Sequence, residues 1–365
     1  MKGNGRKGNR IRRLGAWLAA GLLFLGGSAA AEKTVKLTFT GDCTIGSDSS
    51  TYGLPTSFVT AAYEKGFDYF FANFREMFEK DDCTIINLEG VLSDYKSNEN
   101  TRKLFRFRGP TEFVGILKSV SIEAACLANN HTGDFGAPGL KRTQETLDAA
   151  GIGWFRVQDS YTFEKDGIRI RFFAMDTTSM HANYGWLKNE IARVKREKEA
   201  DAVVAVLHGG TEYDAKRNDT QIKFANQCIE NGADLVIMHH PHVVQGIDII
   251  NQRTACYSLG NFVFGGNDMI REEPYRNSTV TSLYSLVVQA ELHFEDNGTY
   301  KGQRITLYPA FISGSPPRND YQPRLVTGDD ARAVMAAVQF DTFFTLPEFN
   351  EKIGKVVLPY LPAQP

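Results

Sequence analysis

Residues 235–243 read Leu-Val-Ile-Met-His-His-Pro-His-Val, so a short apolar run passes directly into three histidines within four positions. The apolar run, residues 235–238, has the length and composition of a β-strand. Three of the seven histidines of the chain gather at its end, and such a cluster rarely serves packing alone. The stretch therefore predicts a strand whose carboxyl end carries ligand-type side chains.

Outward from this strand, short apolar runs alternate with longer stretches that have apolar residues at three- and four-residue spacing. Strands are predicted at residues 35–39, 84–87, 124–128, 168–174, 202–207, 235–238 and 255–259. Helices are predicted at residues 70–78, 111–119, 139–150, 186–199 and 221–231. Connections of that length suit parallel or mixed sheets, so the pattern predicts an α/β fold.

The last quarter of the chain follows another pattern. Residues 286–294 and 304–309 predict a hairpin joined across Asp296-Asn297-Gly298, and a helix is expected to begin at Thr327, which is placed to cap it. The charged residues 265–281 are expected to form a lid or binding loop. The simplest partition is one domain at residues 32–325, with residues 326–365 as a C-terminal helix and tail packing on it.

The N-terminus has the layout of a secretory signal. Its first thirteen residues hold six cations and no acid, and an apolar run from Leu14 ends in Ser28-Ala29-Ala30-Ala31. Residues 1–31 are therefore expected to form a signal peptide that is removed after Ala31. The alternative is an uncleaved membrane anchor, because roughly eighteen apolar residues are at the lower limit for crossing a bilayer. Both readings place the rest of the chain outside the cytoplasm, secreted or in the cell envelope.

The composition limits which kinds of molecule the protein is expected to bind. With 42% hydrophobic and 12% aromatic residues, the chain has enough apolar material for a large core. Removing the six leader cations from the 41 basic residues leaves 35 against 43 acidic residues, a formal charge of −8. This balance argues against a nucleic-acid partner. A polyanionic ligand would need a local positive feature, such as metal ions or a few arginines.

The five cysteines do not form a disulfide pattern. They are odd in number, lack CxxC spacing and mostly sit in or beside apolar runs, at Cys43, Cys83, Cys126, Cys228 and Cys256. We therefore expect small, buried and reduced side chains.

Five of the predicted strands are followed at once by residue types that bind metal ions. These strand ends are Gly41-Asp42, Asn87-Leu88-Glu89-Gly90, Asn129-Asn130-His131, His208-Gly209-Gly210 and His239-His240-Pro241-His242. Each alone has a plain explanation as a turn, a solvated acid or a packed histidine. Together, those explanations would require five independent coincidences at the same structural position, the carboxyl end of a strand. In open α/β sheets the carboxyl ends of the strands form the crevice in which ligands bind, so one binding site explains all five.

Carboxylate, amide and imidazole ligands without a thiolate suit borderline divalent cations such as manganese, zinc or iron. In sites with two such ions roughly 3.5 to 4 Å apart, a shared carboxylate bridges them and an activated water attacks a phosphoryl or carbonyl centre. The strand ends therefore predict two divalent metal ions in a metal-dependent hydrolase.

The same strand ends lie inside six blocks that resemble, in order, the motifs of the CapA family, which is associated with poly-γ-glutamate capsule synthesis. The blocks are Thr40-Gly41-Asp42, Asn87-Leu88-Glu89, Ala128-Asn129-Asn130-His131 with Asp134 and Gly136, His208-Gly209-Gly210 with Glu212-Tyr213, His239-His240-Pro241-His242-Val243 with Gln245, and Tyr257-Ser258-Leu259-Gly260-Asn261-Phe262. The resemblance implies a metallophosphoesterase-like four-layer α/β/β/α sandwich, in which two sheets face each other and helices lie outside.

The resemblance also implies a role for each site residue. The first metal would be held by Asp42 and His242, with Glu89 at the bridging position. The second metal would be held by Asn130, His208 and His240. His131 would act as general acid or stabilise the transition state, and Asp134 would orient it. The residues expected to support the ligands are His239, Asn129, Glu212 and Asn261.

Arg108 lies in the block Phe105-Arg106-Phe107-Arg108-Gly109-Pro110, which looks like a family motif, and is expected to align an anionic substrate. The plain alternative is an exposed strand or loop cation. Two positions depart from the family pattern, which has an aromatic residue in place of Gly209 and often a glycine in place of Met238. Both departures concern the contour of the pocket, not the proposed ligands.

Three functions fit these observations. The leading hypothesis is an exported CapA-like protein in the synthesis, export or processing of an anionic capsular polymer, working as a hydrolase with two divalent metals. The second is a general secreted phosphoesterase whose substrate is a phosphoester. The third is a non-catalytic accessory of a membrane polymer synthase, which would require membrane synthase proteins as partners. One scaffold hosts many reactions, so the fold alone does not choose among them.

Overall fold

The structure is a computed structural model and describes residues 32–178, 184–275 and 278–364. Residues 32–365 form one compact unit. The predicted signal peptide, with its cleavage point after Ala31, lies outside the described residues. In the described part of the chain, every helix is too short or too polar to cross a membrane.

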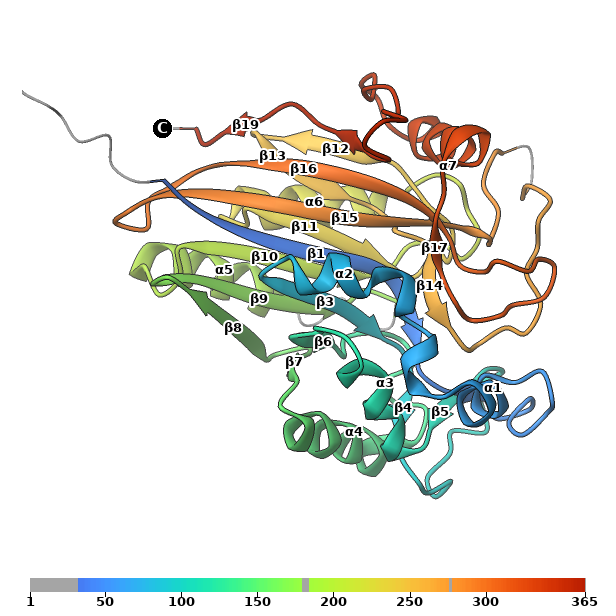
Figure 1. Cartoon of the computed structure of the whole chain (residues 1–365). Helices are drawn as coiled ribbons and strands as arrows, with labels where there is room; N and C mark the ends of the chain where they lie inside the picture. Colours follow the sequence, from blue (N-terminus) through green and yellow to red (C-terminus); the bar gives the residue numbers. More distant parts are fainter. Residues whose placement is uncertain (1–31, 179–183, 276–277, 365) are drawn as a thin grey trace, which may run out of the picture. The chain divides into compact units, whose positions relative to one another are not determined.

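The larger sheet is built around its first strand (Figure 1). β1 (Glu32–Thr44) pairs in parallel with β3 (Cys83–Leu88) on one side and antiparallel with β15 (Tyr284–Glu295) on the other. Beyond β3 follow β6 (Ala124–Cys126) and β7 (Gly153–Phe155), and beyond β15 follow β16 (Tyr300–Phe311) and β17 (Arg324–Leu325). Three short strands join this path: β14 (Asn261–Phe264) on β1, and β18 (Val356–Val357) and β19 (Leu361–Pro362) on β16.

The smaller sheet holds the strand from which the sequence analysis began. Its order is β12 (Ile247–Ile250), β13 (Arg253–Cys256), β11 (Leu235–His239), β10 (Ala202–His208), β9 (Ile168–Asp176) and β8 (Ser160–Lys165). The four inner strands are parallel, so their carboxyl ends lie at one edge. A third, short sheet consists of β2 (Ser47–Asp48), β5 (Phe107–Gly109) and β4 (Val91–Leu92).

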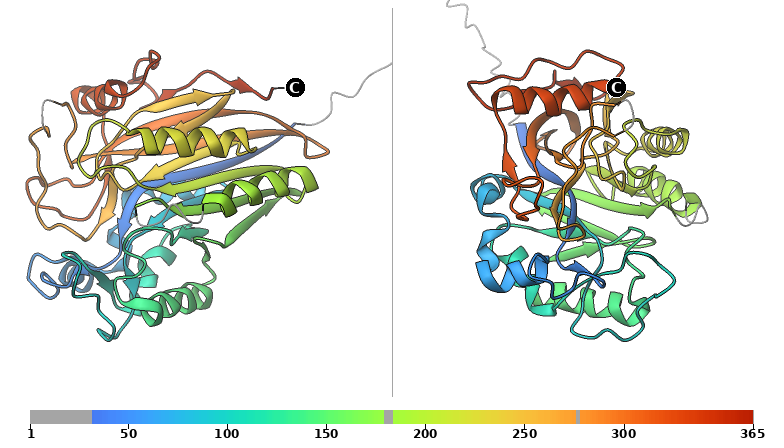
Figure 2. Two further views of the ribbon diagram at one scale, coloured as in Figure 1. Left: turned by 180° about the vertical axis from the view of Figure 1, so that it is seen from behind. Right: turned by 90° about the vertical axis from the view of Figure 1, so that its right-hand side faces the viewer.

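The two larger sheets pack face to face, and helices cover their outer faces (Figure 2). β10 shows the alternation: Val204 and Val206 belong to the core between the sheets, whereas Val203 and Leu207 belong to the core under the helices. The smaller sheet is covered by α5 (Tyr184–Glu197) and α6 (Asp219–Glu230). The larger sheet is covered by α1 (Phe58–Lys65), α2 (Arg75–Glu79), α3 (Val114–Lys118) and α4 (Gly136–Ala150).

This arrangement confirms the predicted four-layer α/β/β/α sandwich. The predicted hairpin is also present, as β15 and β16. The last helix, α7 (Gly328–Phe340), begins directly after Thr327, as expected, but the Thr327 side chain makes no capping hydrogen bond. Val334 and Val338 of α7 are fully buried, so this helix packs on the unit. The boundary at residue 325 stays a prediction.

Two predicted helices are shorter than expected. Residues 70–78 form a 3₁₀ turn (Ala72–Phe74) followed by α2, and residues 111–119 form a 3₁₀ turn (Thr111–Phe113) followed by α3. Both regions bury apolar side chains three or four positions apart: Phe71, Phe74 and Phe78 in the first, and Phe113, Ile116 and Leu117 in the second. A 3₁₀ turn repeats every three residues and buries the same positions, so apolar spacing does not distinguish it from an α-helix.

All five cysteines are free and buried, as predicted. Burial raises the pKa of the thiols of Cys43, Cys126, Cys228 and Cys256 to about 12. These side chains are therefore small apolar parts of the cores.

Candidate metal centre

The strand ends meet as the sequence predicts. Asp42 of β1 is in register with Asn87 of β3 on one side and with Asn261 of β14 on the other. Gly41 makes the close approach to β14 possible, because a Cβ atom there would lie 2.3 Å from the carbonyl oxygen of Gly260. In the smaller sheet, the last residue of β10, His208, is paired with the last residue of β11. The two sheets thus bring their carboxyl ends to one place.

Three predicted ligands surround the Nε2 atom of His208. The Oδ1 atom of Asn130 lies 2.9 Å away, Nδ1 of His240 lies 3.1 Å away and Oε1 of Glu89 lies 3.6 Å away. Two ligands of one tetrahedral ion with bonds of roughly 2.1 Å are themselves about 3.4 Å apart. These separations fit a divalent ion, and the grouping is the one expected for the second metal.

A second set surrounds the Asp42 carboxylate, which is fully buried. Its Oδ1 atom lies 3.0 Å from Nδ1 of His239 and accepts a 2.8 Å hydrogen bond from Asn87, and its Oδ2 atom lies 3.4 Å from Nδ1 of His242. Burial would raise the pKa of Asp42, but hydrogen bonds from His239 and His242 outweigh it and hold the pKa well below its usual value. Asp42 is therefore an anion, the form in which a carboxylate binds a metal ion.

The carboxylate of Glu89 tests whether the residues present fit a metal ion. Its side chain is buried, and neither carboxylate oxygen has a hydrogen-bond partner among the described residues. Burial, with the nearby Asp42 carboxylate, raises the pKa of Glu89 well above its usual value. Buried polar atoms are almost always satisfied, and a cation between the two carboxylates would satisfy both. The residues present therefore fit a metal site.

The histidines differ in charge. Burial, followed by repulsion from His240, holds the pKa of His208 well below its usual value, and burial with repulsion from His242 lowers the pKa of His240 to about 4. Both are neutral at pH 7 and available as ligands. Burial opposes protonation of His242, but Asp42 and Glu89 outweigh it and raise its pKa to about 9. The neighbouring carboxylates thus favour positive charge at this position.

The turn that carries these histidines is conformationally unusual. His240 has a φ of 104° and His242 a φ of 57°, values that side chains other than glycine rarely adopt. His240 is held there by its backbone N–H, which donates to Asp42 over 3.3 Å, and His242 by its Nδ1 atom, 2.8 Å from the Oδ1 atom of Asn261. Backbone strain of this kind collects at functional sites, where the surrounding structure fixes it.

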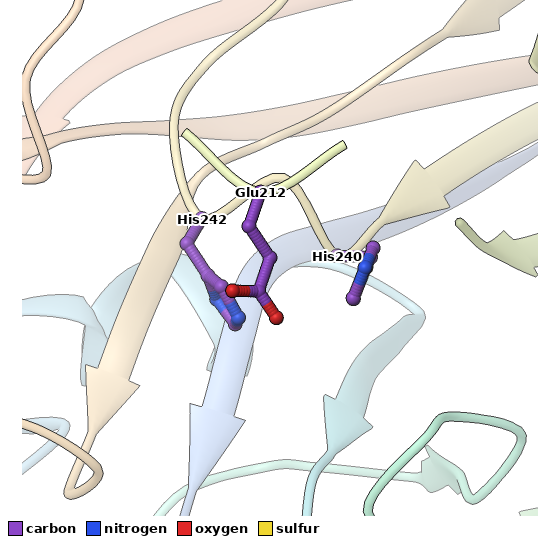
Figure 3. A group of neighbouring side chains, drawn as sticks. All are labelled: Glu212, His240 and His242. Atoms are coloured by element: carbon purple, nitrogen blue, oxygen red, sulfur yellow. The ribbon is translucent and has the colours of Figure 1, made fainter. Parts of the chain in front are cut away.

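Glu212 approaches the centre from the outside. Its carboxylate lies between the side chains of His240 and His242, and one ligand atom from each of the three lies within 4.8 Å of the others (Figure 3). A second such group in the described part of the chain consists of Asp42, Glu89 and His208. The sequence placed Glu212 among the supporting residues, and the geometry makes it a candidate ligand as well.

His131 and Asp134 form the predicted pair beside the metal centre. The Nδ1 atom of His131 lies 2.7 Å from Oδ2 of Asp134, and the ring of Phe107 lies over the imidazole with 4.1 Å between ring centroids. Burial lowers the pKa of His131, although Asp134 opposes that shift. The backbone N–H of Phe107 also donates to Asp134, over 2.8 Å. The ring of His131 is thus held in one orientation.

Asn129 supports the neighbouring residues, as expected. Its side-chain amide donates to the carbonyl of Leu88 over 2.8 Å, and its Oδ1 atom accepts from the backbone N–H of His131 over 3.1 Å. It therefore ties the turn that carries His131 to the strand end that carries Glu89.

Arg108 is buried and lies on β5, away from the ligand contacts described above. Its guanidinium group donates to the carbonyl of Ser93 over 2.8 Å and stacks on the ring of Tyr52, 4.3 Å from the ring centroid. These contacts fix the loop after β4 and the strand that carries Phe107. Alignment of a substrate by Arg108 stays a prediction.

Two residues at the site were not among the predicted ones. Asn87, inside a quoted block, donates to Asp42, and its Nδ2 atom lies 3.3 Å from Nδ1 of His208. Lys103 donates to the carbonyl of Asn130 over 2.7 Å and forms a salt bridge with Asp134. The sequence could have indicated Asn87, because it lies two residues before Glu89 at the end of a predicted strand. It could not have indicated Lys103, which lies in a polar loop without any periodic pattern.

Comparison with known proteins gives a consistent result. Residues 36–266 match the model of the family described as "Bacterial capsule synthesis protein PGA_cap". The chain is 29% identical over 258 residues to "Capsule biosynthesis protein CapA" of Bacillus anthracis, covering 64% of this chain and 60% of that protein. It is 29% identical over 221 residues to "PGA biosynthesis protein CapA" of Bacillus subtilis, covering 55% and 58%.

A more distant relative is a "Probable polyglutamine synthesis accessory protein" of Mycobacterium tuberculosis, 24% identical over 231 residues and covering 53% of this chain and 59% of that protein. The chain thus spans 58 to 60% of the length of these relatives. Among solved structures, a hypothetical protein from Thermus thermophilus superposes with a TM-score of 0.44 at 13% identity, over 75% of this chain and 99% of that one.

Proposed function

The chain belongs to the bacterial capsule synthesis family PGA_cap, and from this membership we propose that it takes part in the synthesis, export or processing of an anionic capsular polymer such as poly-γ-glutamate. The proposal includes a hydrolytic step at a site for two divalent metal ions. The observation that carries the site is the buried Glu89 carboxylate, which has no hydrogen-bond partner among the described residues and lies 3.6 Å from Nε2 of His208.

The proposed metal ligands are the six residues that converge at the strand ends. Asp42 and His242 would hold one ion, Asn130, His208 and His240 the other, and Glu89 would lie between them. Bound divalent ions would supply Lewis acidity and activate water as a nucleophile. Glu212 is placed to complete the outer side, since its carboxylate lies beside His240 and His242.

The proton chemistry is assigned to His131. Asp134 accepts from its Nδ1 atom, so Nε2 would give a proton to the leaving group from the doubly protonated imidazole, which becomes neutral in that step. The Asp134 carboxylate is itself held by Lys103 and by the backbone N–H of Phe107. Phe107 covers one face of the imidazole and limits its rotation. These contacts hold His131, the proposed general acid, in one orientation before any substrate binds.

A second candidate is a non-catalytic accessory of a membrane polymer synthase. It is favoured by the name of the mycobacterial relative, which describes that protein as an accessory of polymer synthesis. In that case the metal would serve structure, and membrane synthase proteins would be the partners. Both proposals predict bound metal, but only the first predicts that the protein hydrolyses a substrate.

The first test is the metal content of the purified full chain alongside Glu89→Ala and His240→Ala. We expect about two divalent ions per chain, lost or halved in the variants. The control is His293→Ala, which removes a histidine of β15 that pairs with Glu32 at the far end of the larger sheet. Absence of metal from every form would end the proposal of a metal-dependent enzyme.

The second test is turnover of the metal-loaded protein. Cleavage of a γ-linked glutamate oligomer would support polymer processing, and cleavage of simple phosphodiesters alone would support a general phosphoesterase. Full metal loading without turnover of either would favour the accessory role.

Export is part of the proposal. The basic and apolar layout of residues 1–31 supports a signal peptide. N-terminal sequencing of protein recovered from the producing cells tests it: a chain beginning at Glu32 supports cleavage after Ala31, and an intact N-terminus in the membrane fraction supports an anchor.

A further inference from the structure

A cavity of about 640 Å³ adjoins the candidate metal centre. Its wall is formed by the segment that follows β10, residues 211–216, by Arg271 and Tyr275, and by Phe340 at the end of α7. Glu212 belongs both to this wall and to the group with His240 and His242. A molecule in the cavity would therefore reach Glu212, which lies beside His240 and His242.

Two cations, Arg271 and Lys216, line this cavity together with the carboxylates of Glu212 and Asp214. The guanidinium carbon of Arg271 lies 4.7 Å from the ring centroid of Tyr275, and Nζ of Lys216 lies 5.2 Å from that of Phe340. In the parts of the chain that the structure describes, neither cation makes a salt bridge with a carboxylate. Arg271 is held in place by the ring and by the carbonyls of Glu273 and Pro274. Both cations are thus positioned, yet free to pair with an anion.

Aromatic faces form the second feature of the wall. The rings of Tyr213 and Tyr275 are stacked, with centroids 4.9 Å apart and planes inclined by 20°. The Tyr213 ring also lies 5.9 Å from that of His242, so the stacked pair leads toward the metal centre. Aromatic faces suit flat groups such as amides and the apolar stems of side chains.

Hydrogen-bonding groups complete the wall. Thr211 and Asp214 lie in the same segment as Lys216, and Oδ1 of Asp214 accepts from the backbone N–H of Lys216 over 3.1 Å. Their oxygens are acceptors for amide N–H groups. The cavity therefore offers cations for carboxylates, acceptors for amides and ring faces for the links between them.

We propose that this cavity binds a segment of a polycarboxylate chain with amide links, held through Arg271, Lys216 and the Tyr213–Tyr275 pair, and directs it toward the metal centre. The identity of the chain as a capsular polymer rests on the proposed function. A phosphate polymer fits less well, because tetrahedral phosphates have no flat face to lie on the rings of Tyr213 and Tyr275.

The test is calorimetric binding of a γ-linked glutamate oligomer to the full chain, with the α-linked oligomer and a glycerol phosphate oligomer as comparisons. The double variant Arg271→Gln/Lys216→Gln is expected to bind the γ-linked oligomer at least roughly tenfold more weakly, because two ion pairs are lost. The matched control is Lys188→Gln/Arg196→Gln, which removes the same charges from α5.

A second variant, Tyr275→Ala, tests the ring platform separately and is expected to weaken binding while Arg271→Lys retains most of it. Metal content and hydrolysis of a simple phosphodiester are measured on the same samples. If the cavity variants bind the oligomer more weakly and keep their metal content, the result supports binding in the cavity. This result does not depend on hydrolysis, so failure of the hydrolase proposal can be told apart from failure of the binding proposal. Binding of both glutamate linkages supports a general polycarboxylate site, and preference for the γ-linked oligomer assigns it to that polymer.

Three outcomes overturn the inference. The first is that the γ-linked oligomer does not bind the wild-type chain. The second is that the double variant and its α5 control bind equally well. The third is that the glycerol phosphate oligomer binds in preference to both glutamate oligomers.

Discussion

The Oε1 atom of Glu89 lies 3.6 Å from Nε2 of His208, and both residues are buried. This contact joins the carboxyl end of the larger sheet to that of the smaller one. Since the pKa of Glu89 is raised by burial and by Asp42, and that of His208 is lowered by burial, the two side chains do not form a stable ion pair with each other. A divalent ion would be stabilised by both, and the stability of the whole unit should depend on it.

The first prediction therefore concerns metal and stability. Adding manganese to chelator-treated protein at a hundred times its dissociation constant should raise the free energy of unfolding by about 2.7 kcal/mol. Glu89→Gln should abolish this gain, because a bridging ligand is lost. In the metal-free protein the same change should be nearly neutral, because the raised pKa of Glu89 favours an uncharged carboxyl group there and glutamine is uncharged and similar in size.

Urea unfolding with and without manganese measures both effects. Glu291→Gln is the control, since it removes a half-buried carboxylate of β15 that pairs with Lys36 and Arg304. A full manganese gain in Glu89→Gln would mean that the ion binds elsewhere.

The second prediction assigns Lys103 to positioning of the general acid. Lys103→Met should lower kcat by roughly tenfold with little change in KM, because Asp134 loses a partner and His131 loses its fixed orientation. The loss should be larger for a phosphodiester with an alkyl leaving group than for one with a nitrophenyl group, which leaves without a proton. Lys103→Arg should retain most of the activity.

Lys96→Met is the matched control for Lys103, because Lys96 is exposed in the same loop and lies over the ring of Tyr52. Equal losses for alkyl and nitrophenyl substrates in Lys103→Met would contradict a role in proton transfer.

The third prediction follows from Gly209. A Cβ atom at this position would lie 1.7 Å from Oγ1 of Thr177, whose N–H and hydroxyl both donate to the carbonyl of His208. Gly209→Ala should therefore destabilise the protein by about 1 to 3 kcal/mol through overpacking. Thr177→Ala in the same chain should recover part of that loss. Independent, additive effects of the two substitutions in urea unfolding would contradict the contact.

The fourth prediction concerns pH. Burial raises the pKa of Asp81 from its ordinary value of 3.8 to about 7, although hydrogen bonds from Thr38 and Thr84 oppose the shift. The folded chain thus binds this proton more tightly than the unfolded chain does. Its contribution to stability is fully present below pH about 4, falls as the pH rises toward 7, and is constant above.

Asp81→Asn should remove this part of the pH dependence and make the protein more stable than wild type at pH 8, by on the order of 2 kcal/mol. The measurement is the difference in unfolding free energy between the two proteins from pH 4 to 8. Glu64→Gln, an exposed carboxylate of α1, is the control and should show a flat difference. A flat difference for Asp81→Asn as well would contradict the prediction.

Much of this fold could be predicted from local patterns. Each predicted strand of the two large sheets lies within or overlaps an observed one, because buried strands are continuous apolar runs. The convergence of the candidate ligands was predictable because they stand at the carboxyl ends of those strands, as His208 does directly after Leu207. The short helices α2 and α3 were predicted too long, since the spacing of apolar residues fits a 3₁₀ turn equally well.

Other features depend on contacts between distant segments and have no local signal. Lys103 reaches Asp134 from a loop with no pattern, and the position of Glu212 between His240 and His242 depends on how two loops pack. The orientation of Arg108 depends on a ring that lies 56 positions away, Tyr52. Long-range packing of this kind decides which charged side chains face a ligand and which support the scaffold.

The central place of β1 has a consequence for biosynthesis. Residues 32–39 are the first of the described chain to be made, yet they pair with residues 288–295 of β15, about 250 positions later. Closing a loop of that length is slow, and until β15 is made one edge of β1 has no strand beside it. The apolar side chains of β1, Val35, Leu37 and Phe39, therefore stay without their final partners while most of the remaining protein is still being synthesised.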